Sequence, residues 1–193
     1  MKKIFIALLL AVSISGCSSG RCIFNCEVTP DFSSQADEYA EQGNYVAAIE
    51  TLDKGLEIFP KDYEFLTKRA ILLSRTGKYY EAIQDYNKAQ KIDPSKAELY
   101  FYRAAPYMKL KEYDNAIKDY TKAIEIAPHY ADAYINRGVA YAALGNNEQA
   151  IKDFDRALYI DAKNMRALKQ KALAKSNLVN NQGVTNVKLE FGN

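Results

Sequence analysis

The side chains that could do covalent or metal chemistry are few in this sequence. It contains three cysteines, Cys17, Cys22 and Cys26, and a single histidine, His129. A catalytic histidine needs a partner that orients or activates it, and the sequence offers His129 none. Cysteines without histidine partners form an incomplete zinc-ligand set. Glycine-rich phosphate loops and serine nucleophile motifs are also missing from the sequence. We therefore predict no metal site, no cofactor and no enzymatic activity.

The N-terminal residues have the pattern of a secretory signal. Two lysines follow the initial methionine, and an apolar run over residues 4–14 leads to small residues. This run is too short to span a bilayer, which needs about 20 residues. Residues 14–17, Ile-Ser-Gly-Cys, resemble a bacterial lipobox. The resemblance implies that residues 1–16 are a lipoprotein signal peptide and that Cys17 carries the lipid. Ser18 then favours the periplasmic face of the outer membrane.

Residues 17–28 are expected to form a tether between the lipid and the rest of the chain. Within it, Cys22 and Cys26 make an even pair in an oxidising compartment. A disulfide within the chain, a disulfide between chains and two free thiols all remain open, because sequence alone does not fix the pairing.

The rest of the chain repeats itself at a spacing of 34 residues. In one unit, Tyr100, Ala104 and Tyr107 are spaced i, i+4, i+7, which places them on one side of a helix. Neighbouring units carry the equivalents Leu66, Ala70, Leu73, Tyr134, Gly138 and Tyr141. A second half-unit repeats in the same way at Ala82, Tyr86, Ala89, Ala116, Tyr120, Ala123, Ala150, Phe154 and Ala157. Pro60, Pro94 and Pro128 close three of the units, since proline ends a helix.

This pattern resembles the tetratricopeptide repeat. The resemblance implies an all-α fold, a right-handed α-α superhelix of four helix-pair repeats with a C-terminal capping helix. The four expected units are residues 29–62, 63–96, 97–130 and 131–164. A polar capping helix is expected over residues 165–177, because the last unit of a solenoid would otherwise expose its apolar side. We expect a flexible tail over residues 178–193.

Several residues depart from the repeat pattern, among them Asn147 at a turn tyrosine and Ala162 at the closing proline. Lys111 stands at a turn where Gly43, Gly77 and Gly145 stand in the other units. Pro106 lies inside an expected helix, where proline typically costs about 3 kcal/mol. Its equivalents are other apolar residues, so the proline either bends the helix for a function or is tolerated by a stable array.

The charged residues indicate ion pairs and exclude one class of partner. Three arginines and three aspartates recur at the 34-residue spacing: Arg69, Arg103, Arg137, Asp85, Asp119 and Asp153. We expect them to pair, within a unit or between neighbouring units. The net charge of +2 includes the two lysines of the signal, so the remainder is neutral. A nucleic-acid partner is not expected, because such proteins usually carry a basic patch.

The family resemblance also implies a concave groove, lined by the first helix of each unit, that binds a protein or peptide ligand. A second apolar stripe on these helices gives the candidate groove residues: Ile71, Phe101, Ala105, Met108, Ile135 and Val139. The alternative is that these side chains pack between neighbouring first helices. The Lys/Asn/Arg set with which some family members hold a C-terminal carboxylate is not matched, so capture of a chaperone tail is not expected.

The sequence thus predicts a lipid-anchored, non-enzymatic adaptor in the bacterial periplasm, with a use in assembling envelope complexes. Its partners would be a protein or peptide in the groove and the membrane through the lipid. The alternative function is a structural or stress-related envelope component that acts mainly by self-association.

Overall fold

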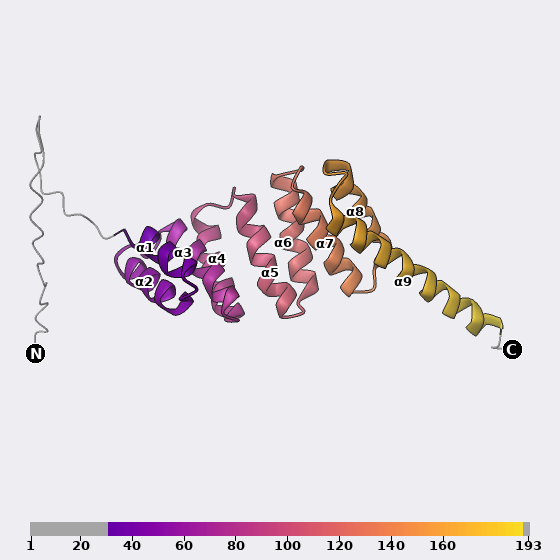
Figure 1. Cartoon of the computed structure of the whole chain (residues 1–193), viewed down its shortest axis with the longest axis horizontal. Helices are drawn as coiled ribbons and strands as arrows, with labels where there is room; N and C mark the ends of the chain where they lie inside the picture. The colour runs from indigo at the N-terminus through magenta and orange to yellow at the C-terminus, as the bar shows by residue number, and fades with distance from the viewer. Residues whose placement is uncertain (1–30, 191–193) are drawn as a thin grey trace, which may run out of the picture. The chain divides into compact units, whose positions relative to one another are not determined.

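The computed structural model describes residues 31–190 of the chain, and the side chains of residues 31–180. These residues form nine α-helices that follow one another in chain order (Figure 1). The helices are α1 (Phe32–Glu41), α2 (Tyr45–Ile58), α3 (Tyr63–Arg75), α4 (Tyr79–Ile92), α5 (Ala97–Lys109), α6 (Tyr113–Ile126), α7 (Ala131–Ala143), α8 (Asn147–Ile160) and α9 (Met165–Glu190). The predicted all-α array of four helix pairs with a capping helix is confirmed.

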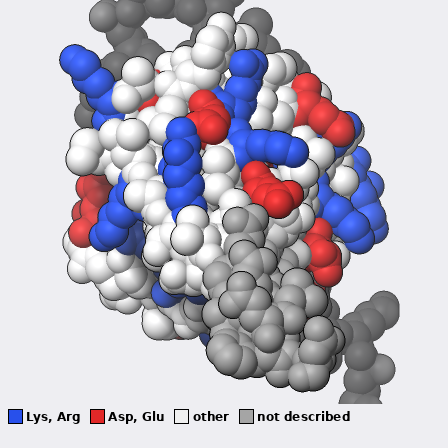
Figure 2. Space-filling model, turned by 90° about the vertical axis from the view of Figure 1, so that its right-hand side faces the viewer, with Lys and Arg blue, Asp and Glu red and all other residues white. Residues whose placement is uncertain are grey.

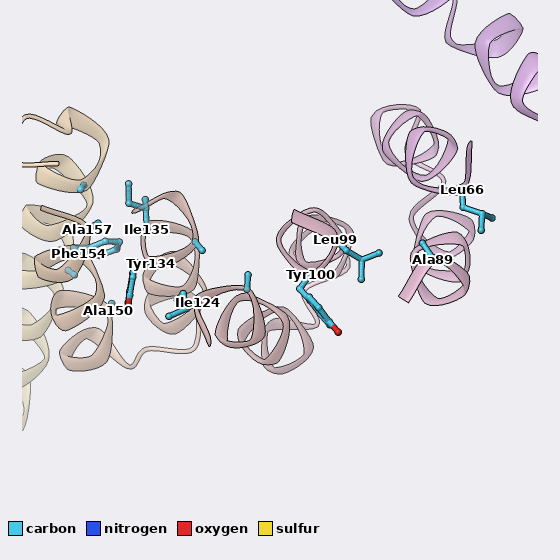
Figure 3. Packing of buried hydrophobic residues seen from close by; sticks show 14 of the residues in the cluster. Leu66, Ala89, Leu99, Tyr100, Ile124, Tyr134, Ile135, Ala150, Phe154 and Ala157 are labelled. Carbon is cyan, nitrogen blue, oxygen red and sulfur yellow. The ribbon is translucent and has the colours of Figure 1, made fainter. Parts of the chain in front are cut away.

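In three of the four pairs a small residue on the first helix meets a ring on the second, and in the first pair Ala36 meets Leu52 instead. Figure 3 shows this packing where Phe154 of α8 lies beside Tyr134 of α7. A Cβ atom added to Gly138 would lie 2.7 Å from Cε1 of Phe154, and that ring is fully buried. The helices therefore approach closely only because residue 138 has no side chain.

A ladder of charges joins successive units. The guanidinium group of Arg103 (α5) donates two hydrogen bonds to Asp119 (α6), of 2.8 and 2.6 Å, and one of 2.7 Å to Asn87 of the preceding second helix (α4). The same arrangement recurs along the array, and we call its members the charge ladder. They are Arg69 with Asp85 and Asp53, Arg103 with Asp119 and Asn87, Arg137 with Asp153 and Thr121, and Lys171 with Asp155. The predicted ion pairs are confirmed and lie within units, and each cation also reaches back to the unit before.

The turns between paired helices need a left-handed residue. Gly43, Gly77 and Gly145 have φ angles of 77°, 83° and 81°. Lys111 adopts the same conformation with φ 61°, the one positive φ of a non-glycine residue among residues 31–190. Glycine is preferred at this position because it has no Cβ penalty, so Lys111 stores local strain.

Pro106 does not shorten its helix. Helix α5 has 13 residues, as do its equivalents α3 and α7. The ring is buried, and the equivalent residues Leu72 and Ala140 are buried too. Pro106 therefore occupies a packing position rather than a ligand-facing one.

Helix α9 takes the place of a fifth first helix and extends further than predicted. Ala167 and Ala174 are buried where it packs against α8. It continues through Glu190 and projects beyond α8 (Figure 1), because no proline interrupts it after the expected end at residue 177. The flexibility of residues 178–193 stays a prediction. Figure 2, which views the array from this end, shows acidic and basic side chains interspersed, as a capping surface requires.

The predicted signal peptide and tether lie outside the described residues, together with Cys17, Cys22 and Cys26. Within residues 31–190, no helix combines the length and the apolar character that crossing a membrane requires.

Candidate functional site

The first helices form the inner side of the array. Helix α3 contacts both α1 and α5, and α7 contacts α9. Successive second helices make no comparable contacts within residues 31–190. The first helices lie closer together than the second helices, so the array curves toward the side that the first helices form. We call the exposed surface of the first helices on this side the first-helix face.

At its N-terminal end the first-helix face carries polar side chains that bond to one another. The Nζ atom of Lys68 lies 2.6 Å from a carboxylate oxygen of Asp37 and 3.0 Å from one of Glu64. Ser33 donates a hydrogen bond to Glu64 and accepts one of 2.5 Å from Lys68. These four side chains satisfy one another, so this end offers few free groups to a ligand.

Next to this network the face opens into a hollow of about 210 Å³, which we call the α3–α5 hollow. It is lined by Tyr63, Thr67, Ile71, Tyr86, Lys96, Glu98, Leu99 and Tyr102. Its volume is below the ~300–1,000 Å³ typical of small-molecule sites, so it suits a side chain of a partner rather than a cofactor.

The six predicted groove residues fall into three groups. Ile71 lines the α3–α5 hollow, and Ala105 is exposed on α5. Met108 and Val139 are half-buried and pack partly against the core. The other two, Phe101 and Ile135, lie deeper than predicted.

Ile135 corrects the prediction most clearly. Its side chain is 0% exposed and belongs to the same core cluster as Tyr134 and Phe154 (Figure 3). It cannot touch a ligand in this conformation. The alternative left open by the sequence, packing inside the array, holds for this residue.

Phe101 fills the space between α5 and the segment that enters α7. Its ring stacks on Tyr130 with centroids 4.7 Å apart and lies 5.8 Å from the ring of Tyr120. These contacts hold the segment that leads into α7 against α5, at a point where α5 and α7 themselves make few contacts. Phe101 is therefore mainly a packing residue, with a partly exposed edge.

Tyr102 is a candidate site residue that sequence reasoning missed. Its side chain is 43% exposed, it lines the α3–α5 hollow, and its ring meets that of Phe101 edge-on at 5.4 Å. A signal was present in the sequence, because the equivalent residues are the polar Lys68 and Asn136. Because the other units have a polar residue at this position, packing within the repeat does not require an aromatic side chain there.

The tyrosines near the hollow remain protonated at neutral pH. Burial raises the pKa of Tyr63, and the negative charges of Asp93 and Glu98 raise it further. Burial, followed by Tyr102 and Glu98, raises the pKa of Tyr130 to about 12. Both hydroxyl groups can therefore donate hydrogen bonds to a ligand.

A larger hollow, of about 480 Å³, lies on the other side of the array between α2 and α4. Three of its four charged lining residues are already paired: Arg69 lies 2.6 Å from Asp53, and Lys88 lies 3.2 Å from Asp85. A ligand there would have to displace partners that already neutralise one another. We therefore place the candidate site in the smaller, more apolar hollow of the first-helix face.

A stack of helix pairs with an open, partly apolar inner face is a helical-repeat scaffold for binding other proteins. The chain belongs to the tetratricopeptide repeat family. This repeat matches it over residues 34–62, 51–84, 72–111, 105–145 and 131–164. Such repeats are protein–protein interaction scaffolds and typically non-catalytic.

Solved structures agree with this assignment. A crystal structure of MamA is 27% identical, with a TM-score of 0.70, over 73% of this chain and 82% of that one. The first repeat domain of Spaghetti (RPAP3), bound to the HSP90 peptide SRMEEVD, is 32% identical with a TM-score of 0.59 over 61% of this chain and 93% of that one. The second repeat domain of human RPAP3, in complex with the HSP70 peptide SGPTIEEVD, is 32% identical with a TM-score of 0.55 over 57% and 92%. No curated protein matches the sequence.

Proposed function

We propose that this protein is a lipid-anchored adaptor that binds a protein or peptide partner on its first-helix face, in the periplasm of a bacterium. The observation that carries the binding proposal is the α3–α5 hollow, where Ile71 and the exposed ring of Tyr102 line an opening of about 210 Å³. Exposed apolar surface with a polar rim usually marks a partner site. Lys96 and Glu98 supply that rim.

Peptide binding by related domains supports this proposal. Both RPAP3 domains were solved with a peptide. Whether this chain uses the same side of its repeats is the point to test.

A photo-crosslinking residue placed at Tyr102 tests the binding face directly. Cells producing this variant should give a crosslinked partner, because the side chain lies in the proposed site. Tyr80 of α4 is the matched control, since it is also an exposed tyrosine, at 66%, on a second helix. Crosslinks from residue 80 and none from residue 102 would place the partner on the other side.

The anchoring proposal rests on the sequence pattern of residues 1–18 alone. Cys17 would carry the lipid, and Ser18 would direct the protein to the outer membrane. A protein at that location could take part in assembling envelope complexes. The Cys17→Ala variant should lose metabolic labelling with palmitate and leave the membrane fraction. Labelling that persists in this variant would reject the lipobox interpretation.

Self-association is the second candidate function, and one observation favours it. Leu168 of α9 is 43% exposed, whereas its equivalents Leu66, Tyr100 and Tyr134 are buried against their second helices. Helix α9 has no such partner within residues 31–180. If a second copy covers this side, sedimentation velocity should show a dimer or larger species that Leu168→Glu converts to monomer. A monomeric parent protein would remove this candidate.

A further inference from the structure

The acidic residues of the first-helix face are not equivalent. One acidic residue lies in the first turn of each of three first helices, at Glu64, Glu98 and Asp132. Glu64 pairs with Lys68 at 3.0 Å, and Asp132 lies 3.7 Å from Arg166. Glu98 forms no ion pair with any charged side chain of residues 31–180, and the nearby Lys96 is 3.8 Å from Asp93 instead. Glu98 therefore carries an uncompensated negative charge in the middle of the face.

Glu98 also lies where two hollows meet. It lines the α3–α5 hollow and a second, shallower hollow of about 440 Å³ formed with residues 127–130. A segment that crosses the middle of the first-helix face must therefore pass this carboxylate.

Tyrosine side chains surround the same carboxylate. Tyr63 and Tyr102 line one hollow and Tyr130 lines the other. Glu98 shares the α3–α5 hollow with Tyr63 and the second hollow with Tyr130, and after burial its charge contributes to the raised pKa of both tyrosines. Faces of aromatic rings attract cations, as does a free carboxylate. The aromatic rings and the unpaired carboxylate thus favour a positive ligand group, and Lys96, the one lysine or arginine that lines either hollow, lies 3.8 Å from Asp93.

We propose that Glu98 and the α3–α5 hollow together recognise a partner segment in which an arginine or lysine lies next to an apolar residue. The apolar side chain enters the hollow against Ile71 and Tyr102, and the cation pairs with Glu98 beside the tyrosine rings. This inference rests on the proposed binding function and adds the chemistry of the partner. It also separates this chain from the acidic peptides SRMEEVD and SGPTIEEVD of the two RPAP3 domains, whose carboxylates Glu98 would repel.

Fluorescence anisotropy with three pools of labelled short peptides tests the inference on the purified repeat protein. The pools share a leucine beside a fixed arginine, glutamine or glutamate, with small residues elsewhere. The arginine pool should bind about tenfold more tightly than the glutamate pool, since attraction is exchanged for repulsion at one site. This advantage should shrink as salt is added, because exposed charges are screened.

Two charge variants identify the residue responsible. Glu98→Gln should bring the ratio of the affinities for the arginine and glutamine pools to about one, because the charge that distinguishes them is gone. Glu81→Gln is the matched control, because Glu81 is likewise exposed in the first turn of its helix, α4, but belongs to a second helix. It should keep the full advantage.

The outcomes separate this inference from the function on which it rests. If all three pools bind equally and Tyr102→Ala weakens that binding, the charge preference is wrong but the proposed binding face is correct. An arginine preference that survives Glu98→Gln would also overturn the inference. No binding of any pool, together with no crosslink at residue 102, would reject the binding face itself.

Discussion

The charge ladder and the α3–α5 hollow differ in whether their charged side chains are paired. In the ladder each arginine has a partner from its own unit and one from the unit before, and the aspartates of its own unit are buried, as Asp85 is at 3% side-chain exposure. At the hollow, Glu98 is exposed and has no ion-pair partner among residues 31–180. The ladder follows the 34-residue period, whereas Tyr102 departs from it. The comparison teaches that periodic residues hold this array together and that aperiodic ones distinguish its surface.

The largest expected effect comes from breaking the ladder at Arg103. Arg103→Ala would leave the buried carboxylate of Asp119 without its partner, which typically costs about 3–5 kcal/mol. Urea unfolding followed by circular dichroism measures this loss. Lys122→Ala is the control, because Lys122 pairs with Glu125 at 3.0 Å with both side chains exposed, and such pairs contribute under ~1 kcal/mol. Equal effects of the two variants would mean that the ladder does not stabilise the array.

The adjacent residues Phe101 and Tyr102 sharpen the comparison. Phe101→Ala removes a ring that stacks on Tyr130 at 4.7 Å, and it should lower the free energy of unfolding by roughly 3 kcal/mol. Tyr102→Ala should cost less than ~1 kcal/mol, because its ring is largely on the surface, and should instead weaken partner binding. Thermal unfolding and peptide anisotropy on both variants measure the two effects. The reverse pattern would exchange the roles of the two residues.

The smallest effect concerns the turn between α5 and α6. Lys111 adopts φ 61°, so Lys111→Gly should raise the free energy of unfolding by about 1 kcal/mol through relief of strain. Lys118→Gly, at an exposed position inside α6, should lower it by about the same amount. A Lys111→Gly protein that is no more stable than the parent would show that the turn is not strained.

Sequence alone determined the architecture. The 34-residue period located all eight paired helices. Apolar residues three and four positions apart indicate the buried side of a helix, and a glycine or proline indicates its end. It also predicted that the three recurring arginines pair with the three recurring aspartates, but it left open whether they pair within or between units and gave no sign of the contacts with Asp53, Asn87 and Thr121. Only the end of α9 differed, as a helix with no neighbour beyond it has no contact that fixes where it stops.

The tertiary structure alone decided which apolar side chains are available to a ligand. Ile71, Phe101 and Ile135 all belong to the second apolar stripe of the first helices, yet Ile71 lines a hollow, Phe101 stacks on Tyr130, and Ile135 is fully buried. Periodicity fixes the side of a helix on which a residue lies. How far that side is covered depends on the distance to the next helix and on the size of the neighbouring side chains, which are contacts between units that no single helix encodes.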